Sequence, residues 1–157
     1  MANNMRWRYG DTNPVTLPVS SSTAIDIGDL VFVNGGTAVP ASDLSDAGTE
    51  SSNQEAFHDA FVGVAMQCSP AGSTDPIRIA TTGVFEFDAT SATYAVGALI
   101  GPDEDATGVQ LENQVVTEVA TANLAIGRCA KAVDPAATRV LVDIVSTVLK
   151  GGPQAAA

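Results

Sequence analysis

Short runs of alternating or continuous hydrophobic residues, separated by turn-forming residues, recur along most of the chain. We predict strands over residues 24–33, 61–68, 77–89 with a kink at Gly83, 94–101, 109–119, 124–133 and 139–149. Turn signals such as Asn-Gly-Gly at 34–36 lie between them, and helical periodicity is hardly visible. The pattern predicts an all-β fold, a compact β-sandwich or barrel built from short strands.

Three stretches depart from this pattern. Residues 1–20 contain isolated hydrophobic residues together with Pro14 and Pro18, which favour extended backbone, so we predict an extended arm that is ordered only against another molecule. Within a β-rich body over residues 21–149, the polar and acidic residues 43–60 are predicted to form a long inserted loop with room for one helical turn at 53–61. Residues 150–157 are predicted to be a flexible tail.

The two halves of the body resemble each other weakly. Residues 24–32 align with 94–101, which places Gly28 against Gly97, and residues 61–81 align with 125–145, which places Gly63 against Gly127. This similarity predicts two pseudo-repeated β-units around one core. The alternative is a chance likeness between strands that are all rich in Val, Gly and Ala.

Composition and charge exclude several classes of partner. The 157 residues are 45% hydrophobic, and they carry a net charge of -11 from 18 acidic and 7 basic residues. Such an acidic surface repels phosphate groups, so we expect no nucleic-acid binding and no adsorption to an anionic membrane. The first ten residues lack the apolar core of a signal peptide, and no apolar run has the length of a membrane span, so we expect a soluble protein made in the cytoplasm.

The residues best suited to binding another protein are concentrated near the N-terminus. The only Trp, one of the two Tyr and two of the seven basic residues fall within the first nine positions. Aromatic and Arg side chains dominate the energetics of protein interfaces. The candidate binding residues are therefore Met5, Arg6, Trp7, Arg8 and Tyr9. The alternative is that Trp7 folds back as a hydrophobic plug on its own domain.

Residues for catalysis or cofactor binding are scarce. The one histidine, His58, has Asp59 as its neighbour in the chain, and adjacent residues do not face one another as a catalytic triad requires. No nucleotide-binding motif occurs, and Asp103, Glu104 and Asp105 lack the spacing of a calcium-binding loop, which favours a solvated acidic turn. We therefore expect no enzymatic activity, no cofactor and no metal.

The two cysteines offer neither a metal site nor an obvious bridge. Cys68 and Cys129 lie far apart in the sequence, and no pair of closely spaced cysteines is present. Because both are flanked by apolar residues, we expect buried free thiols, with a disulfide as the alternative.

The order of several stretches resembles a known family. These are AIDIGDLVFV, FVGVAM, IRIATTGVFEF, AVGALIG, LAIGRCAKAV and RVLVDIV, within residues 24–149. Together they resemble the capsid cement, or decoration, proteins of tailed bacteriophages, although no single motif is specific. The resemblance implies a β-rich structural virion protein, usually a homotrimer, that sits on the outer surface of the capsid and has no catalytic residues. The acidic segment 43–60 and the aromatic N-terminus depart from the compact family pattern.

The resemblance and the composition together predict a function. We expect a cement protein that binds the major capsid protein through residues 5–9 and stabilises the expanded head by clamping neighbouring subunits. The alternatives are a receptor- or glycan-binding β-sandwich and a tail-associated structural protein. Against the glycan-binding alternative, the loops at 43–60, 69–76 and 102–108 hold a single aromatic residue, Phe57.

Overall fold

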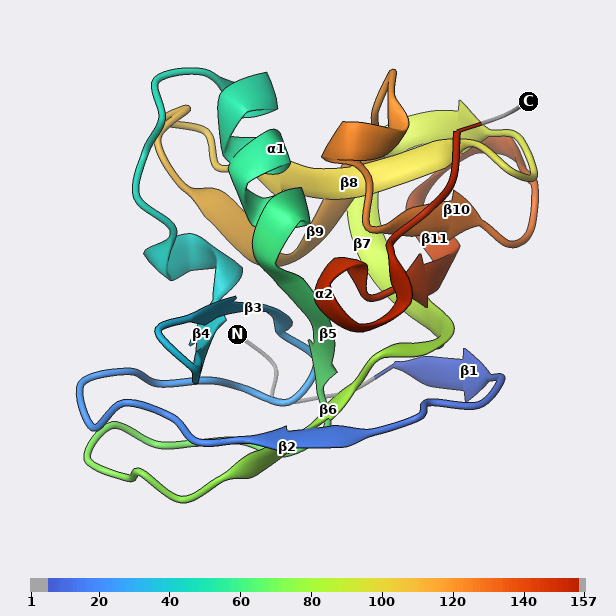
Figure 1. Cartoon of the computed structure of the whole chain (residues 1–157). Helices are drawn as coiled ribbons and strands as arrows, with labels where there is room; N and C mark the ends of the chain where they lie inside the picture. The colour runs from blue at the N-terminus through green and yellow to red at the C-terminus, as the bar shows by residue number, and fades with distance from the viewer. Residues whose placement is uncertain (1–5, 156–157) are drawn as a thin grey trace.

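The protein folds into two β-sheets, and one substantial helix packs beside them against strands of both (Figure 1). The structure, a computed structural model, describes residues 6–155. The strands are β1 (Trp7–Tyr9), β2 (Val15–Leu17), β3 (Leu30–Asn34), β4 (Thr37–Pro40), β5 (Phe61–Ala65), β6 (Ile77–Ala80), β7 (Thr82–Tyr94), β8 (Leu99–Glu104), β9 (Leu111–Glu118), β10 (Gly127–Cys129) and β11 (Val133–Val145). The helices are η1 (Ala41–Asp43), α1 (Glu50–Ala60), η2 (Ala122–Leu124) and α2 (Thr147–Lys150). The predicted all-β class is confirmed.

The two sheets repeat one topology. Strands β2–β6, here called the first unit, pair in the order β2-β6-β5-β3-β4. Strands β7–β11, the second unit, pair in the order β7-β11-β10-β8-β9, which is the same arrangement one unit later in the chain. A parallel pairing between β7 and β9 closes the second unit into a barrel. In the first unit, a single parallel bridge from Val19 to Ala38 makes the corresponding link.

The glycines that align in the sequence occupy matching places in the two units. Gly63 of β5 lies opposite Val31, and Gly127 of β10 lies opposite Ile100. A Cβ at Gly63 would lie 1.7 Å from the carbonyl oxygen of Ala80, and one at Gly127 would lie 2.2 Å from that of Asp143. Both strands therefore approach the next strand more closely than any side chain permits, as the predicted repeat requires.

Strands β3 and β5 of the first unit are apolar on both faces because each face packs against a different part of the core. Val31 and Val62 pack inside the first unit, with Ile25, Ile77 and Ile79. Their neighbours in the chain, including Leu30 and Phe61, pack in a larger cluster that joins the first unit to the second. A strand buried on both faces has a continuous hydrophobic sequence, as in LVF and FVGVA.

The acidic segment contains a helix of three turns, so the prediction of a loop over 43–60 was wrong there. Thr49 caps α1, its hydroxyl oxygen accepting a hydrogen bond from the backbone N–H of Ser52. Phe57 is fully buried and its ring centroid lies 5.8 Å from that of Phe32. The other buried residues of α1 are polar, Asn53 and Gln54, so the hydrophobic repeat that identifies a helix is missing from the sequence.

The C-terminal part of the chain also differs from expectation. Residues 134–138, predicted as a turn, belong to β11, where Ala137 lies opposite Ala92 of β7. The last strand ends at Val145 and α2 follows it. In the expected tail, Gly152 and Pro153 are buried, and the carbonyl oxygen of Gln154 accepts a hydrogen bond from Arg128. Backbone contacts with the body thus hold the described part of the tail.

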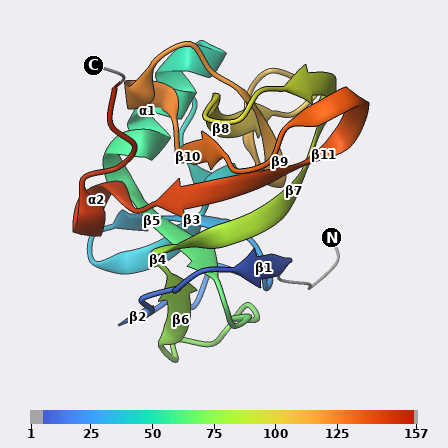
Figure 2. The ribbon, with the colours of Figure 1, turned by 90° about the vertical axis from the view of Figure 1, so that its right-hand side faces the viewer.

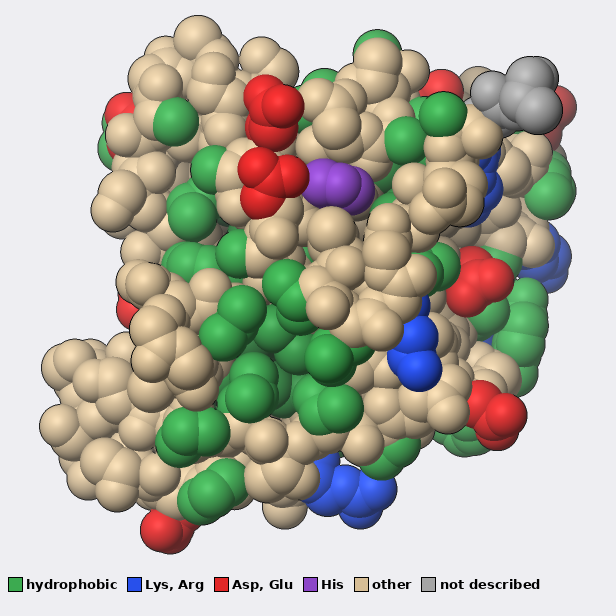
Figure 3. Space-filling view, viewed as in Figure 1, with side chains coloured by type: hydrophobic (Ala, Val, Ile, Leu, Met, Phe, Trp, Pro, Cys, Tyr) green, Lys and Arg blue, Asp and Glu red, His purple; other side chains and the backbone are tan. Residues whose placement is uncertain are grey.

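The face of the molecule over the first unit and α2 is apolar at its centre (Figure 3). Val148 and Leu149 of α2 are about half exposed. Among the described residues, no helix is long and apolar enough to cross a membrane.

Candidate interaction surface

The N-terminal segment pairs with the chain's own sheets, so the expectation of an arm ordered only against another molecule was wrong for residues 6–20. Trp7 lies opposite Phe85 in an antiparallel pair of β1 with β7, and β2 pairs with β6. Between these strands, the carbonyl oxygen of Thr12 accepts a hydrogen bond from the N–H of Thr81. The backbone is extended as predicted, but its partner is the body of the same chain.

Ion pairs add to the backbone pairing of β1 with β7. Both terminal nitrogens of Arg6 donate to the carboxylate of Asp88 at 2.9 Å, and Arg8 lies 3.1 Å from the carboxylate of Glu86. The hydrogen bonds from Arg6 lower the pKa of Asp88. The two Arg residues are two positions apart, as are their two acidic partners, so side chains on one face of β1 meet side chains on one face of β7.

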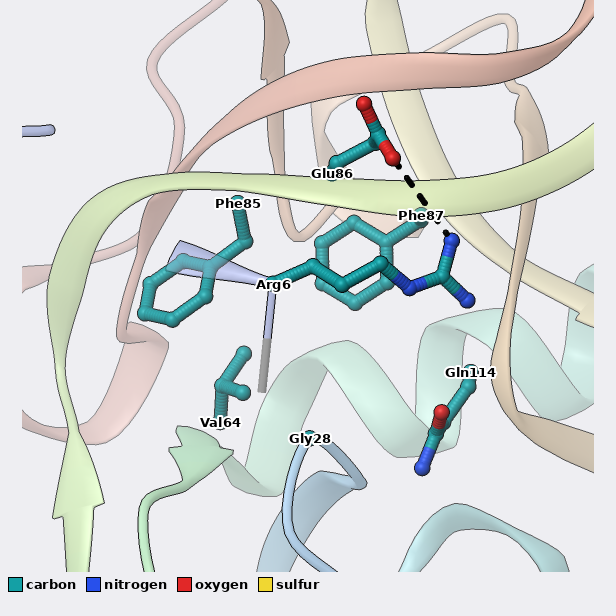
Figure 4. Close-up of a pocket in the computed structure, with 7 residues that line it drawn as sticks. All are labelled: Arg6, Gly28, Val64, Phe85, Glu86, Phe87 and Gln114. Atoms are coloured by element: carbon teal, nitrogen blue, oxygen red, sulfur yellow. Dashed lines mark ion pairs between the residues drawn. The ribbon is translucent and has the colours of Figure 1, made fainter. Parts of the chain in front are cut away.

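Arg6 also covers the junction of the two units (Figure 4). A cavity of about 10 Å³ there is lined by residues of both units, among them Val64, Phe85 and Gln114. The Arg6 side chain extends past the ring of Phe87, and Gln114 donates to the buried carboxylate of Asp29 at 2.9 Å. The aliphatic part of Arg6 packs on apolar surface while its charged end is paired, an arrangement suited to its partial burial.

Trp7 and Tyr9 are the exposed part of this strand. Their relative exposures are 44% and 51%, and the indole N–H of Trp7 donates to the carbonyl oxygen of Gly10 at 3.1 Å. Trp7 is therefore not the buried plug that was the alternative, although its backbone does fold back onto the domain. A rigid strand that presents two half-exposed aromatic rings is typical of a binding surface.

The structure brings four of the five predicted binding residues together and adds others. Arg6, Trp7, Arg8 and Tyr9 are consecutive in and beside β1, whereas Met5 lies outside the described residues. Sequence reasoning missed their partners Glu86 and Asp88, and also Arg139, which lies 3.3 Å from Glu86. The matching spacing of the two Arg in RWR and the two acids in EFD was the available signal.

The other residues considered for chemistry make structural contacts. His58 Nδ1 lies 2.7 Å from the carbonyl oxygen of Ala125, and Glu104 accepts a hydrogen bond from Asn53 at 2.7 Å. Nearby, burial and the charges of Asp103 and Glu104 raise the pKa of Glu50. In residues 6–155, no group of three or more His, Cys, Asp or Glu side chains is placed to hold a metal ion.

Both cysteines are free thiols. Cys129 is buried as predicted, and burial raises the pKa of its thiol. Cys68 is exposed, which corrects the expectation that both are buried, because it follows the end of β5 rather than lying within it.

Comparison with known proteins gives one match, and it covers nearly all of both units. A search of curated proteins finds no match. A family model described as phage cement protein matches residues 10–144, which span both units and begin just after Tyr9. The match covers most of the chain and agrees with the resemblance seen in its strand motifs, so the chain belongs to the phage cement protein family.

Proposed function

We propose that this protein binds the outer surface of a tailed-phage head and clamps neighbouring subunits of the major capsid protein. Membership of the cement family supports a structural role at the capsid.

The binding surface in this proposal is β1. The observation that carries it is the exposure of Trp7 and Tyr9 on a strand whose backbone and Arg side chains are already held by the body. A pre-ordered strand loses little conformational entropy on binding, so most of the interaction energy remains available for affinity. Burying one ring of this size at an interface contributes about 2–4 kcal/mol.

Oligomerisation would multiply this contribution. We propose a homotrimer, following the family resemblance, with one β1 strand in each protomer. Three linked binding sites on one lattice raise the effective affinity by orders of magnitude without any new contact. If the spacing of the capsid sites matches the trimer only after the head has expanded, binding stabilises the expanded lattice by mass action.

Co-sedimentation with phage heads that lack cement protein tests the proposal. The variants are the wild type, the double variant Trp7→Ala/Tyr9→Ala, and Val109→Ala as a control that removes exposed apolar surface at 45% exposure elsewhere. We expect the wild type and the control to sediment with heads, and the double variant to bind at least about tenfold more weakly, because each 1.4 kcal/mol changes affinity tenfold.

Two results would contradict the proposal. If folded wild-type protein binds no heads, the capsid assignment fails and glycans and receptors become the ligands to screen. If the double variant binds as well as the wild type, the capsid role stands but β1 is not the binding surface. Light scattering decides the trimer separately, because the protomer mass is 15.9 kDa.

A further inference from the structure

Basic side chains gather on one side of this acidic molecule. Four of the seven basic residues, Arg6, Arg8, Lys131 and Arg139, lie just before β1, in β1, on the β10–β11 connection and in β11, respectively. All five ion pairs among the described residues join the three Arg of this group to Glu86 and Asp88. Three guanidinium groups thus share two carboxylates, and Lys131 has no ion pair within residues 6–155, so positive charge is left in excess.

A groove runs through this basic group. It has a volume of about 410 Å³ and is bordered by Arg8, Lys131 and Arg139, with Val133, Ala137 and Leu141 of β11 among its lining residues. In Figure 2, β1 and β11 lie on either side of β7 on the side facing the viewer. The groove therefore combines an apolar lining with cationic edges, and its volume suits a short extended segment of chain.

We propose that this groove binds an acidic, extended segment of the capsid protein, a conclusion that rests on the proposed function and specifies its partner. Arg8 lines the groove and lies between Trp7 and Tyr9, so β1 borders the groove with Arg8 and carries the two aromatic rings at its alternate positions. Alternate side chains of an extended segment point the same way, which places its carboxylates toward the Arg and Lys groups and its apolar side chains toward β11.

The ion pairs already present give Glu86 more than one Arg partner, so one of them is free to bind a ligand. Glu86 is approached by Arg8 at 3.1 Å, by Arg139 at 3.3 Å and by Arg6 at 3.9 Å. A ligand carboxylate that draws Arg139 or Arg8 away therefore leaves Glu86 with a remaining Arg partner. Binding therefore leaves no unpaired carboxylate at Glu86, whose side chain is only 19% exposed.

Charge reversal at one lysine tests the groove with phage heads. Lys131→Glu changes an exposed side chain, and Lys150→Glu in α2 is the control with the same change of charge outside the groove. We expect Lys131→Glu to weaken binding to heads at least about tenfold and Lys150→Glu to leave it within about twofold. The affinity of the wild type should also fall between 50 and 300 mM NaCl, since these charges are solvent-accessible. Equal binding by the two variants would overturn the proposal while leaving the capsid role intact.

A peptide experiment decides the groove independently of the heads. The probes are an eight-residue peptide of alternating Glu and Val and its Lys–Val counterpart, titrated into isotope-labelled protein and followed by NMR. We expect chemical-shift changes confined to residues 6–9, 86–88 and 131–141, with the acidic peptide only. Changes elsewhere, none at millimolar peptide, or equal changes with both peptides would overturn the proposal. The proposal would also be overturned if Lys131→Glu lowered the mass of the oligomer in the absence of heads, because the groove would then be a contact between copies of this chain.

Discussion

The first and second units share a topology but differ in what has been added to it. Between β4 and β5 the first unit carries the three turns of α1, whereas the corresponding connection in the second unit holds only the short η2. The second unit has β1 added beside β7, and β7 and β11 are each 13 residues long, against three and four residues for β2 and β6. The repeated part builds the two sheets, and the additions distinguish one unit from the other.

This difference separates the residues that stabilise the fold from those that are available for recognition. Positions shared by the units, such as Gly63 and Gly127, lie where strands approach too closely for a side chain. The exposed rings of Trp7 and Tyr9 lie on β1, outside the shared pattern, and three of the five ion pairs among the described residues join Arg6 or Arg8 to β7. Binding surfaces can therefore change in this architecture without disturbing the common core.

The largest expected effect comes from disrupting the packing of α1, the helix added to the first unit. Phe57→Ala removes a fully buried ring that packs on Phe32 and Phe61, where α1 joins the larger core cluster. We expect the free energy of unfolding to fall by about 3–5 kcal/mol in urea denaturation. The exposed control Val109→Ala should change it by less than about 0.5 kcal/mol. A loss below about 1 kcal/mol for Phe57→Ala would show that α1 does not help to hold the core together.

The equivalence of the two units is tested at their matching glycines. In Gly63→Ala and Gly127→Ala, the new methyl group meets a backbone carbonyl oxygen that cannot move without its strand. We expect each to lower the free energy of unfolding by about 3 kcal/mol. Gly35→Asn is the control, because that site has open space around it and Asn tolerates its positive φ. If one unit accepts Ala and the other does not, the two positions are not equivalent.

A smaller effect is expected at the start of α1. Thr49→Ala removes the hydroxyl oxygen that accepts from the N–H of Ser52 at 3.2 Å. We expect a loss of about 1 kcal/mol, measured by thermal or urea unfolding. Thr49→Ser keeps the cap and should retain most of this stability. Equal losses in the two variants would show that the hydroxyl group contributes nothing.

The smallest effect concerns the attachment of β1 to the second unit. Because Arg6 lowers the pKa of Asp88, this pair stabilises the fold at neutral pH, and its contribution is lost only as the pH falls below about 4, through the lowered pKa. Asp88→Asn should remove it at all pH values. The carboxylate is about half exposed, so solvent screens the interaction and we expect less than about 1 kcal/mol.

The fluorescence anisotropy of Trp7, the only Trp, reports this attachment directly. It should fall in Asp88→Asn at pH 7, and in the wild type only in acid. If the anisotropy of the wild type already falls between pH 7 and pH 5, a titratable group other than Asp88 controls the attachment of β1.

The sequence predicted the sheets better than the connections between them. Strands such as Phe61–Ala65 and Ile77–Ala80 were predictable because their apolar residues are continuous or alternate with a polar residue, as the geometry of a strand requires. Helix α1 was predicted as no more than one turn at 53–61, because Asn53 and Gln54 occupy buried positions that apolar residues usually mark. The start of β11 was missed because its small residues are exposed and pair only through the backbone with β7.

The candidate surface was predictable only in part. The aromatic and basic residues of the N-terminus were visible as a cluster in the sequence. Their attachment to the body depends on Glu86 and Asp88, which lie about half the chain away and meet them only through the pairing of β1 with β7. The matching spacing of RWR and EFD does not specify which acidic segment pairs with β1, so the groove beside Lys131 could be recognised only in three dimensions.

The pairing of β1 with β7 also has a consequence for the order of events during synthesis. A growing chain emerges N-terminus first, and its domains begin to fold as they appear. Trp7 emerges well before its partner Phe85, which follows only after every strand of the first unit has been made. The first unit can therefore begin to fold while β1 is still without its partner. Strand β1 must wait for a strand of the second unit before it can dock.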